Sequence, residues 1–428
     1  MGRKKRVLSG MRPTGPLHLG HFFGALSNWV KMQEEYDCYY FVADWHALTT
    51  HYAEDTRLVR QNTREIVLDW LSVGLDPDKC TMFVQSSIAE HAELHLLLSM
   101  ITPLEWLERV PTYKELISQL REKDLGTYGF LGYPLLQTAD IVMYDADLVP
   151  VGEDQVPHVE LAREVVRRFN FLFGLEVDAE ALRAPENLEA ATAVVTQAKI
   201  FATGNSGTWE LASRDASEIA WGLRRLAANE GIDNFLERNP ALKNFVRNRQ
   251  ALAEPGAMLT ETPRFPGTDG RRMAKSFGNA IWLKDDPETI QKKALGMMTD
   301  PQRVRRTDPG RPEICPVFAY HKLFSEPEKI AWSENGCRTA GIGCVECKRA
   351  MADSLVKWIA PVHQRRKLLE AQPERVNEIL ENGSKQARKV ARRTMRRVRD
   401  AIFGPPLEIA ATPPGAEKPA EPLWSESD

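Results

Sequence analysis

Two histidines, His18 and His21, lie three residues apart in the stretch SGMRPTGPLHLGHFFGAL at positions 9–26. The apolar residues at its start predict a strand over residues 5–9, and a helix is predicted to begin near Leu19. At this spacing the first helical turn places both imidazoles on one face, beside backbone N–H groups that attract anions. Three glycines would let a ligand approach the backbone closely: Gly15, Gly20 and Gly24. The stretch predicts a phosphate site, and the alternative is a pair of histidines that only caps the helix.

A second cationic motif is the stretch PGTDGRRMAKSFGNAIWL at positions 266–283. Its glycines and Asp269 are typical of a loop, and positive charge is concentrated at Arg271, Arg272 and Lys275. A mobile cationic loop near a phosphate site can close on a triphosphate and neutralise charge that develops on the leaving group. Taken alone, the same residues also fit an ordinary surface loop.

Four of the six cysteines follow the spacing Cys315-x21-Cys337-x6-Cys344-x2-Cys347. In a chain expected to be cytoplasmic, disulfides are disfavoured and clustered thiols indicate metal ligands. Four thiolates can hold zinc tetrahedrally or a [4Fe–4S] cluster, and the spacing leaves both open, as well as four unligated thiols. The other two cysteines stand apart and are expected to be buried structural residues: Cys38 and Cys80.

The stretch GSKQARKVARRTMRRVRD at positions 383–400 carries eight lysines and arginines and only one acid, Asp400, at its end. Apolar residues recur through it and just beyond it at helical spacing: Val390, Ala391, Met395, Val398 and Ile402. This pattern predicts a helix with one buried face and one basic face. The basic face is either solvated or contacts the phosphate backbone of a nucleic acid.

Composition limits the class of protein. The 428-residue chain is 43% hydrophobic and 27% charged with a net charge of −3, which is ordinary for a globular protein of two or three domains. There is no apolar run of about 18 residues, so no membrane span is predicted. The basic N-terminus MGRKKRVLSG is not followed by the apolar core of a signal peptide. A cytoplasmic location is therefore expected.

Strands and helices are predicted to alternate in the first 170 residues, with strands at 5–9, 38–50 and 81–87 and a helix at 63–75. This order predicts an α/β fold with a parallel sheet and right-handed crossovers. The region that follows, up to about residue 255, is helix-prone, and no chemistry is assigned to it. Helices are expected to dominate after about residue 293, and a disordered, proline-rich tail is expected at the C-terminus.

Together, the two cationic motifs resemble the HIGH and KMSKS signatures of class I aminoacyl-tRNA synthetases. The residues His18-Leu19-Gly20-His21 correspond to the first signature, and Arg272-Met273-Ala274-Lys275-Ser276 correspond to the second. The second departs from the family pattern at two positions, where Arg272 replaces a lysine and Ala274 replaces a serine. Arg272 keeps the charge, and Lys275, usually the more critical lysine in the family, is intact. The loop is therefore expected to be functional, with altered closing kinetics.

Three stretches are similar to tryptophanyl-tRNA synthetases: residues 132–170, SGMRPTG at 9–15 and FVADWHALTTHY at 41–52. The resemblance covers residues 5–172 and 257–403. It implies ATP-dependent ligation of L-tryptophan to tRNA(Trp) through a tryptophanyl-adenylate, with release of AMP and pyrophosphate.

The resemblance also implies an α/β fold in which a Rossmann-type parallel-sheet catalytic domain is followed by an α-helical anticodon-binding domain. The expected boundaries are listed in chain order: 1–174 for the first part of the catalytic domain, 175–255 for an insertion of unknown role, 256–292 for the rest of the catalytic domain with the KMSKS-like loop, 293–403 for the anticodon-binding domain, and 404–428 for the tail.

Asp140 is implied to bind the substrate amino acid. Tryptophan has one side-chain donor, the indole N–H, which a buried carboxylate would accept. Phenylalanine would leave that carboxylate unsatisfied, at a cost of about 1–3 kcal/mol. From the residues alone, Asp140 could instead be a helix N-cap. Gln137 lies one helical turn before it, and Tyr133 and Gln155 are placed in the same pocket by the resemblance.

The ATP-binding residues implied by the resemblance are Arg12, Pro13, Thr14, Gly20, His21, Gly152, Glu153, Asp154, Arg272, Met273, Ala274, Lys275 and Ser276. The tryptophan carboxylate is already anionic at neutral pH, so its attack on the α-phosphate needs no general base. Catalysis is expected to depend on alignment of the substrates and on charge stabilisation by His18, His21, Lys275 and Mg²⁺.

The cysteine spacing closely resembles a cluster-binding subset of the same family. It implies a structural [4Fe–4S] cluster, with Zn²⁺ as the alternative, on Cys315, Cys337, Cys344 and Cys347. The family also implies a homodimer that binds tRNA(Trp). Arg392 and Arg396, on the basic face of the predicted helix, are expected to contact that tRNA.

Three other classes of protein share part of this pattern. A cytidylyltransferase shares His-x-Gly-His after the first strand, but it is not expected to combine the Asp140 pocket with VGEDQ at 151–155. A tyrosyl-tRNA synthetase is nearer, and pyrophosphate exchange with each amino acid would separate the two. An RNA-binding protein without activity would be expected to have lost the phosphate site, whereas His18, His21 and Lys275 are all present.

Overall fold

The computed structural model describes residues 3–51, 55–111, 126–198, 216–260 and 265–404. The chain divides into two compact units, one of Met1–Phe171 with Leu252–Met395 and the other of Leu172–Ala251 with Arg396–Asp428. None of the helices in the described ranges has the length and apolar character needed to cross a membrane.

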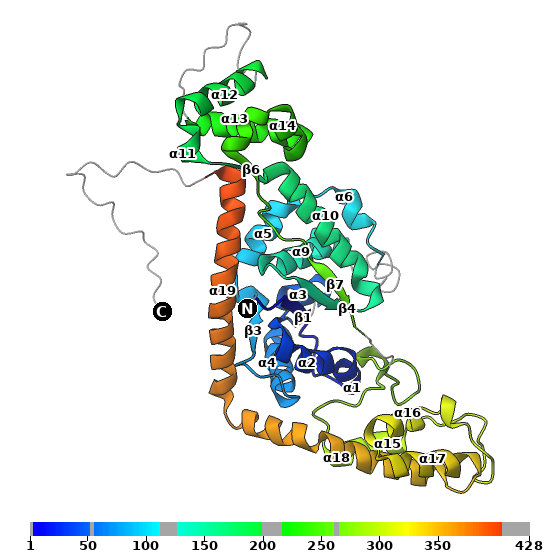
Figure 1. The fold of residues 1–428 in the computed structure, drawn as a ribbon. Helices are drawn as coiled ribbons and strands as arrows, with labels where there is room; N and C mark the ends of the chain where they lie inside the picture. The colour runs from blue at the N-terminus through cyan, green and yellow to red at the C-terminus, as the bar shows by residue number, and fades with distance from the viewer. Residues whose placement is uncertain (1–2, 52–54, 112–125, 199–215, 261–264, 405–428) are drawn as a thin grey trace. The chain divides into compact units, whose positions relative to one another are not determined.

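The larger unit is built on a five-stranded parallel sheet with the order β3-β2-β1-β4-β7 (Figure 1). Its strands are β1 (Arg6–Met11), β2 (Asp37–Val42), β3 (Cys80–Val84), β4 (Leu148–Val151) and β7 (Gly256–Leu259). Strands β2 and β3 are buried along almost their whole length, and β1 is buried over its first three residues, as expected where helices cover both faces of a parallel sheet. The predicted α/β fold with a parallel sheet is confirmed.

The helices of the sheet region connect these strands. They are α1 (Leu19–His21), the π-helical turn η1 (Phe22–Leu26), α2 (Ser27–Glu35), α3 (Asp44–His51), α4 (Arg57–Ser72), the 3-10 turn η2 (Gln85–Ser87), α5 (Glu90–Ser99), α6 (Leu104–Glu108), α8 (Tyr128–Leu131), α9 (Tyr133–Met143), the 3-10 turn η3 (Glu153–Gln155) and α10 (Val156–Phe173). The helix predicted at 63–75 is α4, which begins six residues earlier. It ends before Gly74, whose φ of 110° stops the helix.

The strand predicted at 38–50 is wrong in its second half. Strand β2 ends at Val42, and residues Asp44–His51 form helix α3. Asp44 explains the change, because its carboxylate accepts the backbone N–H of Trp45 at 3.1 Å in the first turn, where helix N–H groups lack partners. The same oxygen accepts the N–H of Ser86 at 3.0 Å, a tertiary contact invisible in the local pattern. The strand predicted at 81–87 also ends early, at Val84.

The C-terminal helices belong to the same compact unit as the sheet up to Met395. They are α15 (Pro287–Leu295), α16 (Pro316–Phe324), α17 (Pro327–Arg338), α18 (Cys344–Glu370) and α19 (Pro373–Phe403), with 3-10 turns η5 (Lys275–Phe277) and η6 (Pro312–Ile314). One apolar core includes Tyr40 and Trp70 of the sheet region together with Tyr320 and Leu355 of these helices. Among the described residues beyond Leu259 no further strand is formed, so the predicted helical C-terminal region is confirmed.

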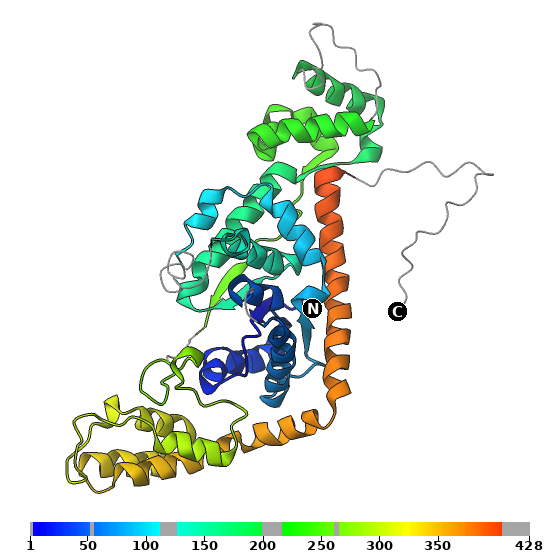
Figure 2. The same ribbon diagram turned by 180° about the vertical axis from the view of Figure 1, so that it is seen from behind.

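Helix α19 runs along the outer edge of β3, as both ribbon views show (Figures 1 and 2). Gly383 lies against the backbone of Met82 so closely that a Cβ there would overlap it. The side chain of Arg388 donates to the carbonyl oxygen of Ser87. The helix therefore covers an edge strand that would otherwise expose unpaired backbone groups.

The second unit has a core of its own, with Leu182, Val195, Leu223 and Phe235 among its buried residues. Its elements are β5 (Leu175–Val177), α11 (Ala179–Leu182), α12 (Pro185–Gln197), α13 (Ala216–Glu230), α14 (Ile232–Arg238), the 3-10 turn η4 (Pro240–Asn244) and β6 (Val246–Asn248). The region predicted to be helix-rich, 175–255, is mostly helical. It also contains the antiparallel pair of strands β5 and β6, which was not predicted. The predicted tail lies outside the described residues apart from Gly404.

Candidate active site

The two histidines of the first motif lie in contact at the start of α1, with ring centroids 3.7 Å apart and the ring planes tilted by 36°. His18 is the N-cap, and its Nδ1 accepts the backbone N–H of His21 at 3.3 Å. In return, Nδ1 of His21 accepts the backbone N–H of His18 at 3.1 Å. Because each Nδ1 acts as an acceptor, each neutral ring carries its proton on Nε2. The histidines thus cap the helix and also keep one N–H donor each.

Both imidazoles are neutral at physiological pH. Burial lowers the pKa of His18 to about 4, and the charges of Lys275 and Arg272 add to this effect. Burial, His18 and Lys275 lower the pKa of His21 to about 2. The expectation that these histidines stabilise charge is thereby refined, because they offer hydrogen bonds from Nε2 rather than positive charges.

The KMSKS-like loop (residues 266–279) meets the first motif through Lys275. Its ammonium donates to the carbonyl oxygen of Gly15 at 2.8 Å and to Oγ1 of Thr14 at 3.3 Å. Burial lowers the pKa of Lys275 to about 8, and the charge of Asp69 opposes that shift. The two motifs, about 250 residues apart in sequence, are therefore adjacent in the fold.

Asn279 holds the KMSKS-like loop together, and the sequence analysis did not single it out. It is 2% exposed, and its Nδ2 donates to Asp269 at 2.7 Å and to the carbonyl oxygen of Arg272 at 3.1 Å. Its Oδ1 accepts the N–H of Ala274 at 2.9 Å. One buried amide thus joins both sides of the loop and gives it a defined conformation.

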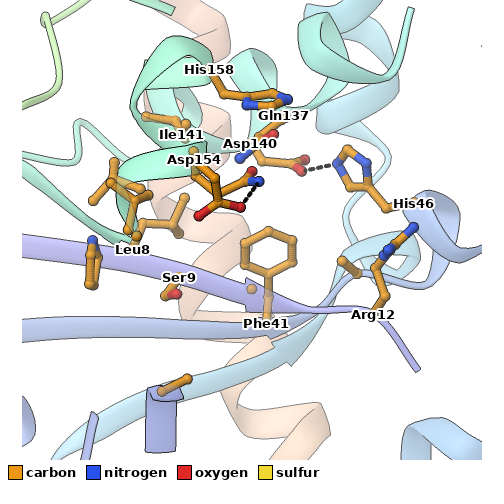
Figure 3. Close-up of a pocket in the computed structure, with 18 of the residues that line it drawn as sticks. Leu8, Ser9, Arg12, Phe41, His46, Gln137, Asp140, Ile141, Asp154 and His158 are labelled. Carbon is orange, nitrogen blue, oxygen red and sulfur yellow. Dashed lines mark hydrogen bonds and ion pairs between the residues drawn. The ribbon is translucent and has the colours of Figure 1, made fainter. Parts of the chain in front are cut away.

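A cavity of about 730 Å³ opens at the carboxyl ends of β1 and β4 (Figure 3), where ligands bind in open parallel sheets. All four residues predicted to bind tryptophan line it: Tyr133, Gln137, Asp140 and Gln155. Of the residues predicted to bind ATP, four line it: Arg12, Gly152, Asp154 and Arg272. The others lie outside its lining, and Met273 is 4% exposed in the apolar core. A Cβ at Gly20 would lie tightly against the His18 ring, at 3.0 Å, and in ordinary contact with Met273.

Asp140 lies inside helix α9, so the alternative that it is an N-cap is wrong. It is 1% exposed, and three side chains from other elements bind its carboxylate. His91 lies 2.6 Å from Oδ1 and His46 lies 2.9 Å from Oδ2, while Nε2 of Gln85 donates to both oxygens at 2.8 and 2.9 Å. His91 is itself fixed by the Tyr144 hydroxyl, 2.6 Å from its other nitrogen.

This network keeps Asp140 ionised. Burial alone would raise its pKa, but the interactions with His91 and His46 outweigh burial and lower the pKa to about 2. A carboxylate has about four acceptor positions, and the four contacts occupy them. A ligand donor must therefore take the place of an existing partner, and His46 is the partner that also lines the cavity.

The sequence pattern predicts none of the three side chains that bind the Asp140 carboxylate, namely His46, Gln85 and His91. The only available signal was a polar residue at the end of an apolar run or within a helix, which is too common to be informative. His158 was also missed. It lines the cavity and lies 3.1 Å through Nε2 from the Tyr133 hydroxyl.

The four clustered cysteines converge in the C-terminal helices. Burial, together with Cys315, Cys337 and Cys344, raises the pKa of the Cys347 thiol to about 11, and the hydrogen bond with Ser333 opposes that shift. Ser333 lies 3.2 Å from the Cys347 sulfur, and a guanidinium nitrogen of Arg303 lies 3.8 Å from the Cys337 sulfur. No group of three or more His, Cys, Asp or Glu residues within the described ranges is close enough to hold a metal ion.

The basic stretch forms part of α19 and has the two faces that its pattern predicts. Val390, Ala391, Met395 and Val398 are buried, while arginines including Arg392 and Arg396 are exposed. Arg392 lies 3.4 Å from the largely buried Glu90, and its own side chain remains 72% exposed.

A parallel sheet with paired histidines after its first strand and a lysine loop closed against them is the arrangement of a class I aminoacyl-tRNA synthetase. The family model described as "tRNA synthetases class I (W and Y)" matches residues 1–191 and 239–360. Tryptophan–tRNA ligase of Ralstonia nicotianae is 49% identical over 93% of this chain and 98% of its own length. The corresponding enzyme of Thermotoga maritima is 43% identical over 93% and 98%. The chain belongs to the tryptophan–tRNA ligase family.

Solved structures agree with this assignment. Tryptophanyl-tRNA synthetase of Campylobacter jejuni, complexed with ADP and tryptophan, is similar with a TM-score of 0.68 and 26% identity. The similarity covers 93% of this chain and 99% of that one. A tyrosyl-tRNA synthetase from Archaeoglobus fulgidus has a TM-score of 0.51 at 17% identity, a likeness of fold alone. The cytidylyltransferase and tyrosyl alternatives are therefore set aside.

Proposed function

We propose that this chain ligates L-tryptophan to tRNA(Trp) in two steps. In the first, the tryptophan carboxylate attacks the α-phosphate of ATP, which forms tryptophanyl-adenylate and releases pyrophosphate. In the second, the acyl group passes to the 3′ end of the tRNA and AMP leaves. The single observation that carries the proposal is the ionised, buried Asp140 on the wall of a cavity that opens beside the two signature motifs.

Asp140 supplies the selectivity for tryptophan. Its carboxylate accepts from the indole N–H in place of His46, which lines the cavity and lies 2.9 Å away. Gln85 and His91 remain bound on the far side and keep the carboxylate oriented and charged. An amino acid without a side-chain donor would displace His46 and would not replace its hydrogen bond to Asp140, at a cost of about 1–3 kcal/mol.

The chemistry of adenylate formation is alignment and stabilisation of charge. As the Pα–O bond to the leaving pyrophosphate breaks, negative charge grows on its oxygens, and the Lys275 ammonium neutralises it. The Nε2–H groups of His18 and His21 donate hydrogen bonds to phosphate oxygens without adding charge. Bound Mg²⁺ supplies further neutralisation of the triphosphate.

The remaining assignments concern partners and location. The exposed arginines of α19, Arg392 and Arg396, are proposed to contact the phosphate backbone of the tRNA. The chain is proposed to act as a homodimer in the cytoplasm, where charged tRNA is used.

The four cysteines are proposed to hold a structural [4Fe–4S] cluster, with zinc as the alternative. Cys315, Cys337 and Cys344 each raise the pKa of the Cys347 thiol, so all four sulfurs belong to one neighbourhood. The four cysteines would hold the cluster, which would tie the start of α16, helix α17 and the first turn of α18 together. Arg303 beside the Cys337 sulfur and Ser333 beside the Cys347 sulfur oppose the upward pKa shifts of these thiols, and they would favour the thiolates that a metal needs.

Pyrophosphate exchange tests the first step. Exchange should require ATP and tryptophan and should be at least about tenfold slower with tyrosine or phenylalanine. Aminoacylation of tRNA(Trp), measured separately, tests the second step. Exchange that is equally fast with tyrosine, or absent with every amino acid, would contradict the proposal.

A further inference from the structure

Asp69 is a buried carboxylate on α4 that the proposed chemistry leaves unused. It is 1% exposed. Its Oδ2 accepts the backbone N–H of Leu17 at 2.9 Å, immediately before His18. Its Oδ1 accepts from Nη1 of Arg366 on α18 at 2.6 Å. One carboxylate thus joins the signature segment, residues 17–21, to a helix of the C-terminal region.

Arg366 is a buried arginine with three carboxylate partners, of which only Asp69 is fully buried. It is 6% exposed, and its guanidinium also reaches Glu65 at 2.8 Å and Glu370 at 2.7 Å. Burial opposes its charge, but Asp69 and the other two carboxylates outweigh burial and raise its pKa. Only an arginine has the planar fork that can bind three carboxylates at once, so a lysine would keep the charge and lose the geometry.

A second chain of contacts joins the same helix to the same segment. The carbonyl oxygen of Leu17 accepts the N–H of Leu283 at 2.9 Å. The carbonyl oxygen of Leu283 in turn lies 3.0 Å from Nε2 of His363 on α18. Leu17 is therefore held through both its N–H and its carbonyl, and both routes end on α18.

We propose that Asp69 and Arg366 are positioning residues that hold the signature segment for adenylate formation, so that helix α18 controls the first step even without tRNA. The inference deepens the proposed function and rests on it. Neither residue lines the cavity, so each acts through Leu17. A shift of Leu17 moves His18 and, through the mutual cap, His21. A misplacement of about 1 Å in an active site can lower the rate about a hundredfold.

Asp69 also acts on Lys275 through its charge. Burial lowers the pKa of Lys275, and Asp69 opposes that shift. Removal of this carboxylate should therefore lower the pKa of Lys275 further, an effect that loss of packing alone would not produce. The charged and titratable groups that surround the pair are Glu65 on α4, Arg366 and Glu370 on α18, Lys284, and His18, His21 and Arg272 beside Lys275.

The test is tryptophan-dependent pyrophosphate exchange in the full-length chain without tRNA. The variants are Asp69→Asn, Arg366→Met, Arg366→Lys and the double variant Asp69→Asn with Arg366→Met. Each of the Asn and Met changes should lower kcat at least about tenfold and leave the KM for tryptophan within about twofold. Arg366→Lys should recover part of the loss, and the double variant should be no slower than the slower single one. In Asp69→Asn, the alkaline limb of kcat/KM for ATP should move to lower pH.

Arg365→Gln is the matched control. Arg365 neighbours Arg366 and donates through Nε to the carbonyl oxygen of Ser72 at 2.5 Å, a contact between α18 and α4 that does not involve Leu17. Its exchange rate should stay near that of the unmodified chain. Thermal unfolding establishes whether each variant is folded. If Arg366→Met does not fold, the test is made with Asp69→Asn and Arg366→Lys. Normal kcat in those two variants, or an equal loss in Arg365→Gln, would overturn the inference. Absence of exchange in the unmodified chain would instead refute the proposed function.

Discussion

The Lys275 ammonium and the carbonyl oxygen of Gly15 lie 2.8 Å apart, although 260 positions separate them in sequence. This hydrogen bond closes the KMSKS-like loop against the backbone that leads into His18. When ATP binds, the ammonium has to exchange this carbonyl, and Thr14, for phosphate oxygens. The resting contact already holds the Lys275 ammonium beside the proposed phosphate site, so the charge has to move only a short distance during the reaction.

The Lys275→Ala variant should form adenylate far more slowly while tryptophan binding changes little. The ammonium is needed chiefly as pyrophosphate departs, and Lys275 does not line the cavity that contains Asp140. Single-turnover kinetics of adenylate formation, with tryptophan binding measured at equilibrium, separates the two effects. A normal rate of the chemical step in this variant would remove Lys275 from the mechanism.

The pH dependence of the free enzyme should reveal the same lysine. Because its pKa is lowered to about 8, the ammonium predominates below pH 8 and the neutral amine above it. We expect kcat/KM for ATP to fall as the pH rises through about 8, since this ratio reports groups of the free enzyme. Lys275→Arg keeps its charge in this range and should lack the alkaline limb. An unchanged limb in that variant would assign it to another group.

Asp140→Asn should lower kcat/KM for tryptophan at least about tenfold and leave the KM for ATP nearly unchanged, because one acceptor for the indole N–H is lost. Asp140→Ala should show the same loss and also be less stable, since Gln85, His46 and His91 would lose their buried partner. Steady-state kinetics and thermal unfolding measure both. Equal damage to the tryptophan and ATP parameters would indicate that Asp140 is structural.

The pair of changes Arg392→Glu and Arg396→Glu should weaken tRNA binding and flatten its dependence on salt. Each lost phosphate contact reduces the slope of log K against log salt by about one. Arg375→Glu is the control, because Arg375 is exposed on the same helix α19 but lies outside the basic stretch. Binding measured over a salt series decides the matter, and an unchanged slope would mean that the basic face is only solvated.

Protein purified without oxygen should be brown and contain about four irons per chain if the cysteines hold a [4Fe–4S] cluster. Cys347→Ser should lose most of that iron, whereas Cys38→Ser should retain it, because Cys38 is buried in β2, far along the chain from the cluster. Metal analysis and visible absorption give the answer. A colourless protein with one tightly held zinc would reverse the choice of metal and leave the ligands in place.

Much of this site could be predicted from the sequence because its motifs are local. His18 and His21 share one helical turn, and the charges of the KMSKS-like loop lie within a few residues. The alternation of apolar strands and helices likewise predicts a parallel sheet, whose strand ends bring separate motifs to one edge. Local patterns are also where the predictions failed. Residues 44–50 are predicted to continue a strand, but they form α3. The Asp44 carboxylate that stabilises the first turn of this helix also accepts the N–H of Ser86 from another element, a contact that the local sequence does not reveal.

Only the tertiary structure decided the protonation states and the partners. The neutrality of His18 and His21 follows from burial and from nearby cations, which no sequence pattern displays. Asp140 stays ionised because His91 lies 49 positions away in the chain and 2.6 Å away in space. Asp69 and Arg366 are separated by 297 positions and meet at 2.6 Å. Hydrophobic periodicity and residue spacing specify which elements form, but electrostatic interactions act over a few ångströms, and those distances exist only once the elements have packed.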